Sequence, residues 1–339
     1  MARLLITGAA GYIGSVLVAE ALKAGHKVVA LDRFFFGEDV LGDYARKPGL
    51  RLIKKDIRDA APEDFKGIDA VIDLAALSND PAGDLDRSLT RSINCRGRIH
   101  VAHTAKAAGV RRYVMSSSCS VFGYSSQKLT ENSPCTPQTE YARSMLDAER
   151  TILRMADSRF CSSALRLSTV FGLSRRMRFD LVVNTMTKSA VNTNKIVVTG
   201  GGKQWRPLIH VRDAARGFLH LINQPVDSIS GEAFNIGRDN YRMSQLAFAV
   251  REALPIALAI EIKPETNDTR SYRVSFAKAK KVLGYAAQHE VEYGVREIYD
   301  AIKQDRIDLG SRTVTVNWYK HLLEAERLVD GIRLNGRIL

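Results

Sequence analysis

The feature that most constrains this chain is a glycine-rich turn directly after its first short apolar run. The run Arg3–Thr7 predicts a buried strand, and the residues after it are Gly8-Ala-Ala-Gly11-Tyr-Ile-Gly14. Gly8 permits a tight turn, Gly11 lets backbone approach a pyrophosphate, and Gly14 lets the next helix pack closely on the strand. The N-terminus of that helix then points its N–H groups at the anion. A strand, turn and helix in this order predict a dinucleotide-binding site.

An acidic residue at the end of the second predicted strand indicates which dinucleotide binds. Asp32 ends the run Lys27–Asp32, where a carboxylate is placed to hold the hydroxyls of the adenosine ribose. Its negative charge disfavours the 2′-phosphate of NADP, while the neighbouring Arg33 weakens that preference slightly. The expected cofactor is therefore NAD.

Short apolar runs alternate with helical stretches over the first half of the chain. Further buried strands are predicted at Leu50–Lys55, Ala70–Ala75 and Arg112–Ser116, with helices at Tyr12–Ala24 and Leu85–Ala108. This alternation implies right-handed βαβ crossovers and a doubly wound parallel sheet. The expected fold class is α/β, with a Rossmann domain followed by a smaller C-terminal α/β substrate lobe.

The pattern becomes less regular in the second half of the chain. The helices predicted there are Gln138–Asp157, Phe179–Ala190, Asp213–Asn223, Ser244–Leu254 and Val291–Gln304. The strands predicted there are Ser162–Ser168, Ile196–Thr199, Leu208–Val211 and Leu258–Ile262. We expect an NAD-binding domain at residues 1–170 and a substrate-binding lobe at 171–312, from which some chain returns to the first domain. A C-terminal helical extension is expected at 313–339, with its helix at Val314–Val329.

Composition and cysteine spacing exclude several other classes of protein. The chain has 339 residues, of which 45% are hydrophobic and 26% are charged, as in an ordinary soluble globular protein. No apolar run approaches the roughly 18 to 20 residues of a membrane helix, and the N-terminus lacks the long apolar stretch of a signal peptide. A cytoplasmic protein without a membrane partner is expected. The four cysteines lie far apart without a C-x-x-C pair, so neither a metal site nor a disulfide framework is expected.

The formal net charge of +13 bears on the kind of partner. A basic surface suits nucleic acid or an anionic small molecule. The lysines and arginines are spread along the whole chain, and no nucleic-acid-binding motif is present in the sequence. An anionic small substrate is therefore expected, and a nucleic-acid partner is not.

Several segments resemble the extended short-chain dehydrogenase/reductases, and the likeness covers nearly the whole chain. Besides the spacing G-x-x-G-x-x-G, the matching segments are Asp56-Ile57, Leu74-Ala75-Ala76-Leu77, Asn94, Ser116–Gly123, Tyr141–Met145 and Trp205–Asp213. The closest likeness is to nucleotide-sugar epimerases and dehydratases of the UDP-galactose 4-epimerase kind. The cofactor contacts that it implies are Gly8, Gly11, Tyr12, Ile13, Gly14, Asp32, Arg33, Asp56, Ile57, Leu74, Ala75, Ala76, Asn94, Ser116 and Tyr141. Within the last segment, His210 and Asp213 are interpreted as packing and capping residues.

The resemblance implies a catalytic pair and one departure from the family pattern. Ser118 takes the place of the catalytic Ser or Thr and Tyr141 that of the base, but Met145 stands where the family carries Lys. Positions i and i+4 share a helix face, so Met145 is expected beside Tyr141, towards the cofactor. A methionine neither bonds the nicotinamide ribose nor lowers the pKa of the tyrosine by its charge. The substitution Met145→Lys is therefore expected to move the rising limb of the pH–rate profile to lower pH.

Three interpretations of this departure stay open. The chain is a working enzyme with a weaker base, or an enzyme that uses another base for different chemistry. The third is that the chain binds NAD and a nucleotide sugar without catalysing a reaction, either as a silent binder or as a variant made to trap a complex. The retained Ser118, Tyr141, Arg206 and Arg270 favour an enzyme, and Met145 favours a binder.

The segment around the predicted catalytic serine indicates which reaction fits best. Family dehydratases carry carboxylates where this chain has Cys119 and Ser120, and neither side chain replaces a carboxylate near neutral pH. The sequence therefore resembles an epimerase more than a dehydratase, and a buried structural thiol is the favoured interpretation of Cys119. In an epimerase, Tyr141 takes a proton from a sugar hydroxyl, most simply at C4, and hydride passes to NAD and returns to the other face. A keto-sugar reductase or dehydratase of the same family is the alternative.

The resemblance also implies a site for a nucleotide-diphosphate sugar. Arg206 is the expected diphosphate ligand, because a guanidinium pairs bidentately with phosphate, and Arg270 is expected to reach the nucleotide as well. Thr169 and Asp180 stand at family contact positions with different side chains, which leaves the sugar and the base open. The expected substrate-binding residues are Ser118, Cys119, Ser120, Thr169, Arg178, Asp180, Leu181, Arg206 and Arg270.

Two of the predicted helices imply a quaternary structure. In related epimerases the helices equivalent to Leu85–Ala108 and Gln138–Asp157 form a four-helix contact between two subunits. An isologous two-fold interface is the commonest kind in soluble oligomers. A homodimer is therefore expected.

Overall fold

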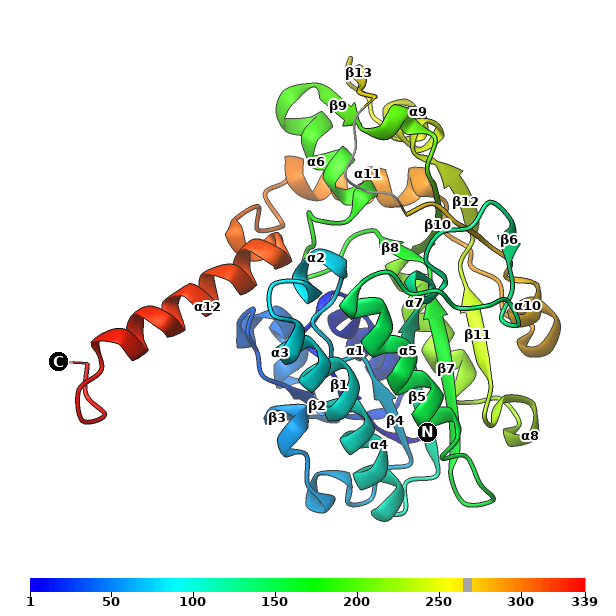
Figure 1. Ribbon diagram of the computed structural model, residues 1–339, viewed down its shortest axis with the longest axis vertical. Helices are drawn as coiled ribbons and strands as arrows, with labels where there is room; N and C mark the ends of the chain where they lie inside the picture. Colours follow the sequence, from blue (N-terminus) through cyan, green and yellow to red (C-terminus); the bar gives the residue numbers. More distant parts are fainter. Residues whose placement is uncertain (265–269, 339) are drawn as a thin grey trace.

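The computed structural model describes residues 1–264 and 270–338 and is built around a parallel sheet of seven strands (Figure 1). The spatial order is β11-β7-β5-β4-β1-β2-β3. The bounds are β1 Arg3–Thr7, β2 Lys27–Asp32, β3 Leu50–Lys54, β4 Ala70–Asp73, β5 Arg112–Ser118, β7 Cys161–Leu167 and β11 Ala233–Ile236. The chain runs from β1 to β2 and β3 on one side and then crosses to β4 on the other. A crevice for ligands therefore opens at the carboxyl ends of β1 and β4, and the predicted α/β fold class is confirmed.

Helices cover both faces of this sheet, because successive side chains along a strand point to opposite sides. In β1, Leu4 and Ile6 pack into one apolar cluster with α1 and α7, while Leu5 packs into another with α4 and α5. The bounds of these helices are α1 Tyr12–Lys23, α4 Arg98–Ala107, α5 Glu140–Leu153 and α7 Val211–Leu221. Burial on both faces explains why the inner strands are continuous apolar runs in the sequence. The prediction of a buried strand at Leu50–Lys55 is wrong as to burial, because β3 is an edge strand in which Arg51, Leu52 and Lys54 are exposed.

The predicted helix Leu85–Ala108 is present but changes its geometry midway. It consists of α3 Arg87–Arg91, a π-helical segment η4 Ser92–Gly97, and α4. The π-helical turn carries Asn94, whose Oδ1 accepts from Leu77 N (2.8 Å) and whose Nδ2 donates to Leu77 O (3.0 Å). These two bonds hold the helix against the segment that follows β4.

A smaller lobe packs three helices around a second apolar core, at the top of Figure 1. These helices are α6 Val182–Thr193, α9 Met243–Ala253 and α11 Val291–Lys303. Its strands form one sheet of order β12-β10-β8 and the pairs β13-β9 and β14-β6. Their bounds are β6 Lys128–Leu129, β8 Thr169–Phe171, β9 Lys195–Val198, β10 Trp205–His210, β12 Asp239–Arg242, β13 Ala259–Ile262 and β14 Arg273–Val274.

The remaining helical segments are short. The α-helical ones are α2 Asp80–Gly83, α8 Val226–Ile229 and α10 Ala277–Leu283. The 3-10 segments are η1 Glu38–Arg46, η2 Ile57–Asp59, η3 Pro62–Phe65, η5 Cys119–Phe122, η6 Gly200–Gly202 and η7 Ser311–Thr313.

Chain beyond residue 170 contributes to the large sheet as well as to the smaller lobe. β11 pairs with β7 at the edge of the large sheet, and α7 packs against α1. The strands β6, β8, β11, β12 and β14 were not predicted from the sequence, because runs of two to four residues carry only a weak periodic signal. The division of the chain at residue 170 stays a prediction.

The last helix, α12 Thr315–Ile332, extends the predicted helix Val314–Val329 by one turn and projects from the body of the molecule (Figure 1). Its first turns join a small apolar cluster in which Tyr319 packs with Phe35 and Phe36. Its far end leaves Leu328 66% exposed and Ile332 55% exposed. The start of this helix is therefore part of the body, whereas the end is a solvent-exposed arm.

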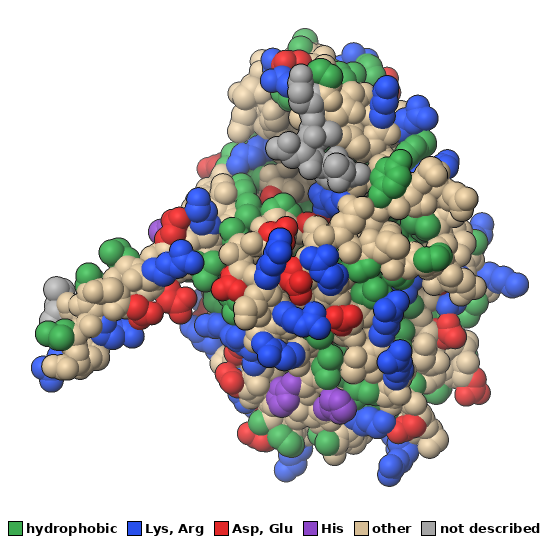
Figure 2. All heavy atoms as spheres, viewed as in Figure 1, with side chains coloured by type: hydrophobic (Ala, Val, Ile, Leu, Met, Phe, Trp, Pro, Cys, Tyr) green, Lys and Arg blue, Asp and Glu red, His purple; other side chains and the backbone are tan. Residues whose placement is uncertain are grey.

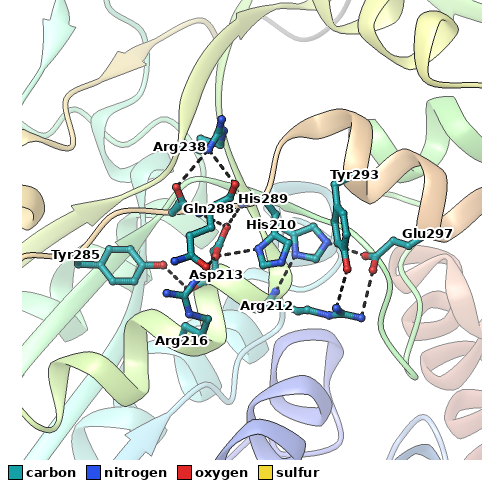
Figure 3. Close-up of polar contacts among 11 residues, drawn as sticks. His210, Arg212, Asp213, Arg216, Arg238, Tyr285, Gln288, His289, Tyr293 and Glu297 are labelled. Atoms are coloured by element: carbon teal, nitrogen blue, oxygen red, sulfur yellow. Dashed lines mark hydrogen bonds and ion pairs between the residues drawn. The ribbon is translucent and has the colours of Figure 1, made fainter.

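A network of polar contacts ties the start of α7 to α11 and to the loop before it (Figure 3). His210 Nδ1 accepts from a backbone N–H in the first turn of α7, and its Nε2 lies 2.7 Å from Glu297 Oε1. Asp213 accepts from the backbone N–H groups of Gln288 and His289, at 2.8 Å each. These contacts agree with the interpretation of His210 and Asp213 as packing and capping residues.

The surface and the remaining side chains give few further indications of function. Within residues 1–264 and 270–338, no helix combines the length and the apolar character needed to cross a membrane, and no group of three or more metal-ligating side chains is found. All four cysteines are free thiols. Figure 2 shows basic side chains interspersed with acidic ones on the face in view.

Candidate active site

A cavity of about 680 Å³ opens at the carboxyl ends of β1 and β4 and continues under the smaller lobe. Its walls come from the glycine loop, the ends of β2, β4 and β5, the first turns of α5, the loop before α6, and α12. Every residue that the sequence predicted for the site lines this cavity, except Asn94 and Cys119. The topology thus brings segments that are distant in the sequence to one crevice.

The glycine loop forms a close-packed cradle that has no room for side chains. Gly8 has a φ of +64°, and a Cβ on it would lie 2.9 Å from Ala75 N. A Cβ on Gly14 would collide with the carbonyl oxygen of Gly8 and lie 2.8 Å from Ala9 Cα. Gly11 is the N-cap of α1, and no side chain caps this helix end. The exposed N–H groups and the absent side chains fit the pyrophosphate of a dinucleotide.

Asp32 lies beside this cradle, with its carboxylate held by backbone. Its Oδ2 accepts from Ala10 N (3.0 Å) and its Oδ1 from Phe34 N (2.7 Å). Burial raises the pKa of Asp32, and the backbone hydrogen bonds from Phe34 and Ala10 oppose that rise. An ionised carboxylate accepts about four hydrogen bonds, so both oxygens retain capacity for the two ribose hydroxyls.

Arg33 is engaged by an acidic partner next to the adenine end of the cavity. Its Nη1 lies 3.1 Å from Asp56 Oδ2, and its guanidinium lies 4.5 Å from the ring centroid of Phe35. Burial alone would raise the pKa of Asp56, but the Arg58 hydrogen bonds and the Arg33 charge bring it below its ordinary value. Because Asp56 compensates the charge of Arg33, the preference of Asp32 for NAD is reinforced.

Tyr141 and Ser118 both line the cavity, at the start of α5 and at the end of β5. Burial raises the pKa of Tyr141, and the nearby carboxylate of Asp80 raises it further. The side chain of Ser118 and the charges of Arg98 and Arg178 lower it, but the net pKa stays above its ordinary value. The cavity therefore brings a buried phenol and a hydroxyl together, an arrangement suited to proton transfer.

Asp80, in the short helix α2, is a charged residue of the cavity that the sequence analysis missed. It is buried, accepts a hydrogen bond from Thr139 Oγ1 (2.5 Å) at the N-cap of α5, and forms an ion pair with Arg270. At the other end of α2, a Cβ on Gly83 would lie 2.8 Å from Tyr141 Cβ. This close approach brings the helix, and with it the carboxylate, against Tyr141.

The expected phosphate ligands lie under the smaller lobe. Arg206 Nη1 donates to Trp205 O (2.9 Å) and to Arg270 O (2.5 Å), and its guanidinium lies 5.9 Å from the ring centroid of Tyr272. These bonds join β10 to the segment that carries Arg270. Both arginines therefore lie next to each other on the wall of the cavity.

Arg178 and Asp180 form a buried pair on the loop before α6. Arg178 Nη2 lies 3.0 Å from Asp180 Oδ2, and Asn79 Nδ2 donates to the same oxygen (2.8 Å). Burial alone would raise the pKa of Asp180, but the charge and hydrogen bonds of Arg178 hold it below its ordinary value. The pair presents a neutral, polar wall to the cavity, next to Thr169 and Leu181.

Two of the predicted site residues lie outside the cavity wall. Both polar atoms of the Asn94 side chain bond the backbone of Leu77, so Asn94 supports the cavity wall, and its contact with the cofactor stays a prediction. Cys119 is fully buried, and its Sγ donates to Arg166 O (3.3 Å). Burial raises the pKa of this thiol. This burial agrees with the interpretation of Cys119 as a structural thiol, and its role as a substrate contact stays a prediction.

The C-terminal extension reaches the cavity, which the sequence analysis also missed. Tyr319 of α12 lines it, and its ring centroid lies 5.8 Å from that of Phe36. Arg176 lies over the same Phe36 ring (3.6 Å) and donates to Thr315 Oγ1 (2.9 Å). These contacts bring α12 over the end of the cavity where Asp32 lies.

Comparisons with known proteins agree with this geometry. The profile of the family described as "NAD dependent epimerase/dehydratase family" matches residues 4–237. UDP-glucuronic acid decarboxylase 1 of Arabidopsis thaliana is 27% identical over 305 residues, which cover 86% of this chain and 68% of that protein. UDP-glucose 4-epimerase of Corynebacterium glutamicum is 26% identical over 307 residues, which cover 85% and 91% of the two chains.

A solved structure with the same fold carries the expected ligands. MoeE5 in complex with UDP-glucuronic acid and NAD has a TM-score of 0.77 and 26% identity, and the match covers 89% of this chain and 99% of that chain. The cofactor predicted from Asp32, NAD, is confirmed.

Proposed function

The chain belongs to the NAD dependent epimerase/dehydratase family, and on that premise we propose that it is a nucleotide-sugar epimerase. It oxidises one sugar hydroxyl transiently, most simply at C4, and the hydride returns to the other face of the keto-sugar. The observation that carries this proposal is that Tyr141 and Ser118 lie together in the cavity that also holds the dinucleotide cradle. The β5 end supplies serines and a buried thiol there, where elimination of water would need a carboxylate.

Each part of the chain has a separate task in this reaction. NAD, when bound, supplies the hydride acceptor and then the hydride donor. The N–H groups at the start of α1 hold its pyrophosphate, and Asp32 holds the adenosine ribose. Tyr141 Oη takes the proton from the sugar hydroxyl and gives it back, while Ser118 Oγ holds the hydroxyl and later the keto oxygen. Arg206 holds the diphosphate of the substrate.

A second candidate, decarboxylation of a nucleotide-linked uronic acid, shares the first step. The Arabidopsis relative is named a UDP-glucuronic acid decarboxylase, and MoeE5 binds UDP-glucuronic acid. Oxidation at C4 of such a sugar gives a β-keto acid, which loses carbon dioxide without a further base. The guanidinium of Arg270, close to Asp80 and Tyr141, is the cation that would meet the sugar carboxylate.

A screen of nucleotide sugars tests the proposal. UDP-, dTDP-, GDP- and CDP-linked hexoses and UDP-glucuronic acid are added to the protein with NAD, and thermal shift identifies those that bind the native state. Proton NMR then follows the bound sugars. We expect interconversion of a pair of C4 epimers without loss of water or carbon dioxide. Carbon dioxide release from UDP-glucuronic acid would support the second candidate, and binding without any new sugar signal would identify a silent binder.

We also propose that two copies associate through the helices α3, η4, α4 and α5. These segments pack against one another within the chain, so their outer faces form one surface. One chain has a mass of 37.6 kDa, and light scattering at micromolar concentration should give twice that mass. A monomer at that concentration would exclude this arrangement.

A further inference from the structure

Helix α5 carries the proposed base Tyr141 and has an uncharged side chain, Met145, one turn after it. Met145 follows Tyr141 at i+4 on the face that lines the cavity, and it is 2% exposed. A thioether carries no charge and accepts hydrogen bonds only weakly. A buried tyrosine with no cation beside it is a poor base at neutral pH, because burial disfavours the phenolate.

Arg98, the first residue of α4, brings a cation to the place where Met145 has none. It is fully buried and borders the cavity. Its Nη1 lies 3.2 Å from Met145 Sδ, while its Nε and Nη2 bond Asp73 Oδ2 and Asp73 O, at 2.7 Å each. The carboxylate thus fixes one edge of the guanidinium, and the other edge points at the methionine sulfur on the helix of Tyr141.

The anchoring of Asp73 fixes the position of this guanidinium. Besides Arg98, Asp73 accepts hydrogen bonds from Thr7 Oγ1 (2.5 Å) and Tyr113 Oη (2.8 Å). Buried charges are tolerated only when they are paired and fully bonded. This network meets that condition, so the cation has a fixed position under the cofactor crevice.

The same geometry explains why residue 145 is not a lysine in this chain. A lysine ammonium at this position would lie against the Arg98 guanidinium, so two cations would share the single carboxylate of Asp73. A methionine accommodates the guanidinium with a soft, polarizable sulfur. With Arg98 in place, Met145→Lys should therefore lower the melting temperature. The sequence alone predicts only that Met145→Lys makes Tyr141 a stronger base. The structure adds the expectation that the same substitution destabilises the fold.

We propose that Arg98 is a positioning residue for Tyr141, supplying from α4 the positive charge that this family places on the tyrosine helix. The inference rests on the proposed function, in which Tyr141 is the base. Four groups act on the pKa of Tyr141: Asp80 of α2, Ser118 of β5, Arg98, and Arg178 of the loop before α6. Arg178 and Arg98 are each paired with a carboxylate, Asp180 and Asp73, but Arg98 also contacts Met145 on the helix of Tyr141, so Arg98 is the cation that we substitute.

Four proteins test this role: wild type, Arg98→Met, the exchange Arg98→Met/Met145→Lys, and the control Arg111→Met. The control removes an exposed arginine just before β5, outside the helices proposed to join two copies. For each protein, the rate is measured against pH with the sugar nucleotide from the screen. The ionisation of Tyr141 is followed separately, by ultraviolet difference titration with NAD bound and no substrate, relative to Tyr141→Phe.

We expect Arg98→Met to move the rising limb of the pH–rate profile, and the Tyr141 titration, to higher pH by about one to two units. The exchange should move both back towards wild type, because one cation again faces one carboxylate. The control should leave both unchanged. If Arg98→Met does not fold, Arg98→Met/Asp73→Asn removes both buried charges together and carries the same expectation.

Other outcomes separate the two proposals. If melting temperatures fall but the pH–rate limb and the titration stay in place, Arg98 only holds α4 to β4, and the inference is wrong while the proposed function stands. If Tyr141→Phe turns over as fast as wild type, the proposed base is wrong, whatever Arg98 does. If the exchange variant stays shifted like Arg98→Met although it folds, charge is not what Arg98 supplies, and the inference is again wrong.

Discussion

Replacing Tyr141 by phenylalanine should lower turnover by about 10²- to 10⁴-fold, the usual contribution of a positioned general base. The phenyl ring keeps the packing against α2, but it removes the oxygen that is proposed to take the substrate proton. Affinities for NAD and for the sugar nucleotide should change only a few-fold, because neither the glycine cradle nor Arg206 is touched. Steady-state rates and calorimetric titrations of each ligand measure the two effects separately.

The pH dependence of the wild-type rate should also reflect the ionisation of Tyr141. Since burial and Asp80 raise the pKa of Tyr141, the phenolate is scarce at neutral pH, and the rate should rise towards alkaline pH. The matched control is Tyr124→Phe, at an exposed tyrosine outside the cavity wall. It should keep the wild-type rate and profile. A Tyr141→Phe enzyme with most of the wild-type rate would mean that another group is the base.

Adding one methyl group to the glycine cradle should have the second large effect. In Gly14→Ala the new Cβ would collide with the carbonyl oxygen of Gly8, and it would lie 2.8 Å from Ala9 Cα. Both neighbours are backbone, so the loop must move away from the helix. Overpacking of this kind costs about 1 to 3 kcal/mol, which corresponds to a loss of about 10- to 100-fold in NAD affinity.

A second glycine gives the control for this experiment. Gly331→Ala lies in the exposed part of α12, where an added Cβ would meet no described atom within 4 Å. It should leave NAD affinity unchanged and add slightly to helix stability. Calorimetric titration of NAD into both variants decides the matter. Equal affinity in the two would show that the cradle does not hold the pyrophosphate.

The parts of the site that the sequence predicted correctly are those encoded locally. The spacing of Gly8 and Gly14 already implies the close approach of helix and strand, and Asp32 follows from its place at the end of β2. Tyr141 and Ser118 followed from a family resemblance in segments that are each only a few residues long. In all these cases the informative neighbours lie within one strand or one helical turn.

The parts that the sequence could not supply depend on contacts between distant segments. The run that contains Asp80 and Gly83 predicts a turn, but only the fold places it against Tyr141, some sixty residues later in the chain. Arg98 meets Met145 across two helices, and Tyr319 reaches the cavity from the far end of the sequence. For Asn94 the position was predicted but not the direction of the side chain, because the π-helical turn and the bonds to Leu77 have no local signature.

The central claim is that Tyr141 and NAD oxidise a sugar carbon and that the same hydride returns to it. The measurement that tests it most directly uses the substrate from the screen, labelled with deuterium at C4, and follows both sugars by NMR at equilibrium. The account predicts two C4 epimers that both retain deuterium at C4, with none formed by Tyr141→Phe. Loss of the label from C4, or a product that has lost water or carbon dioxide, would contradict the epimerase assignment.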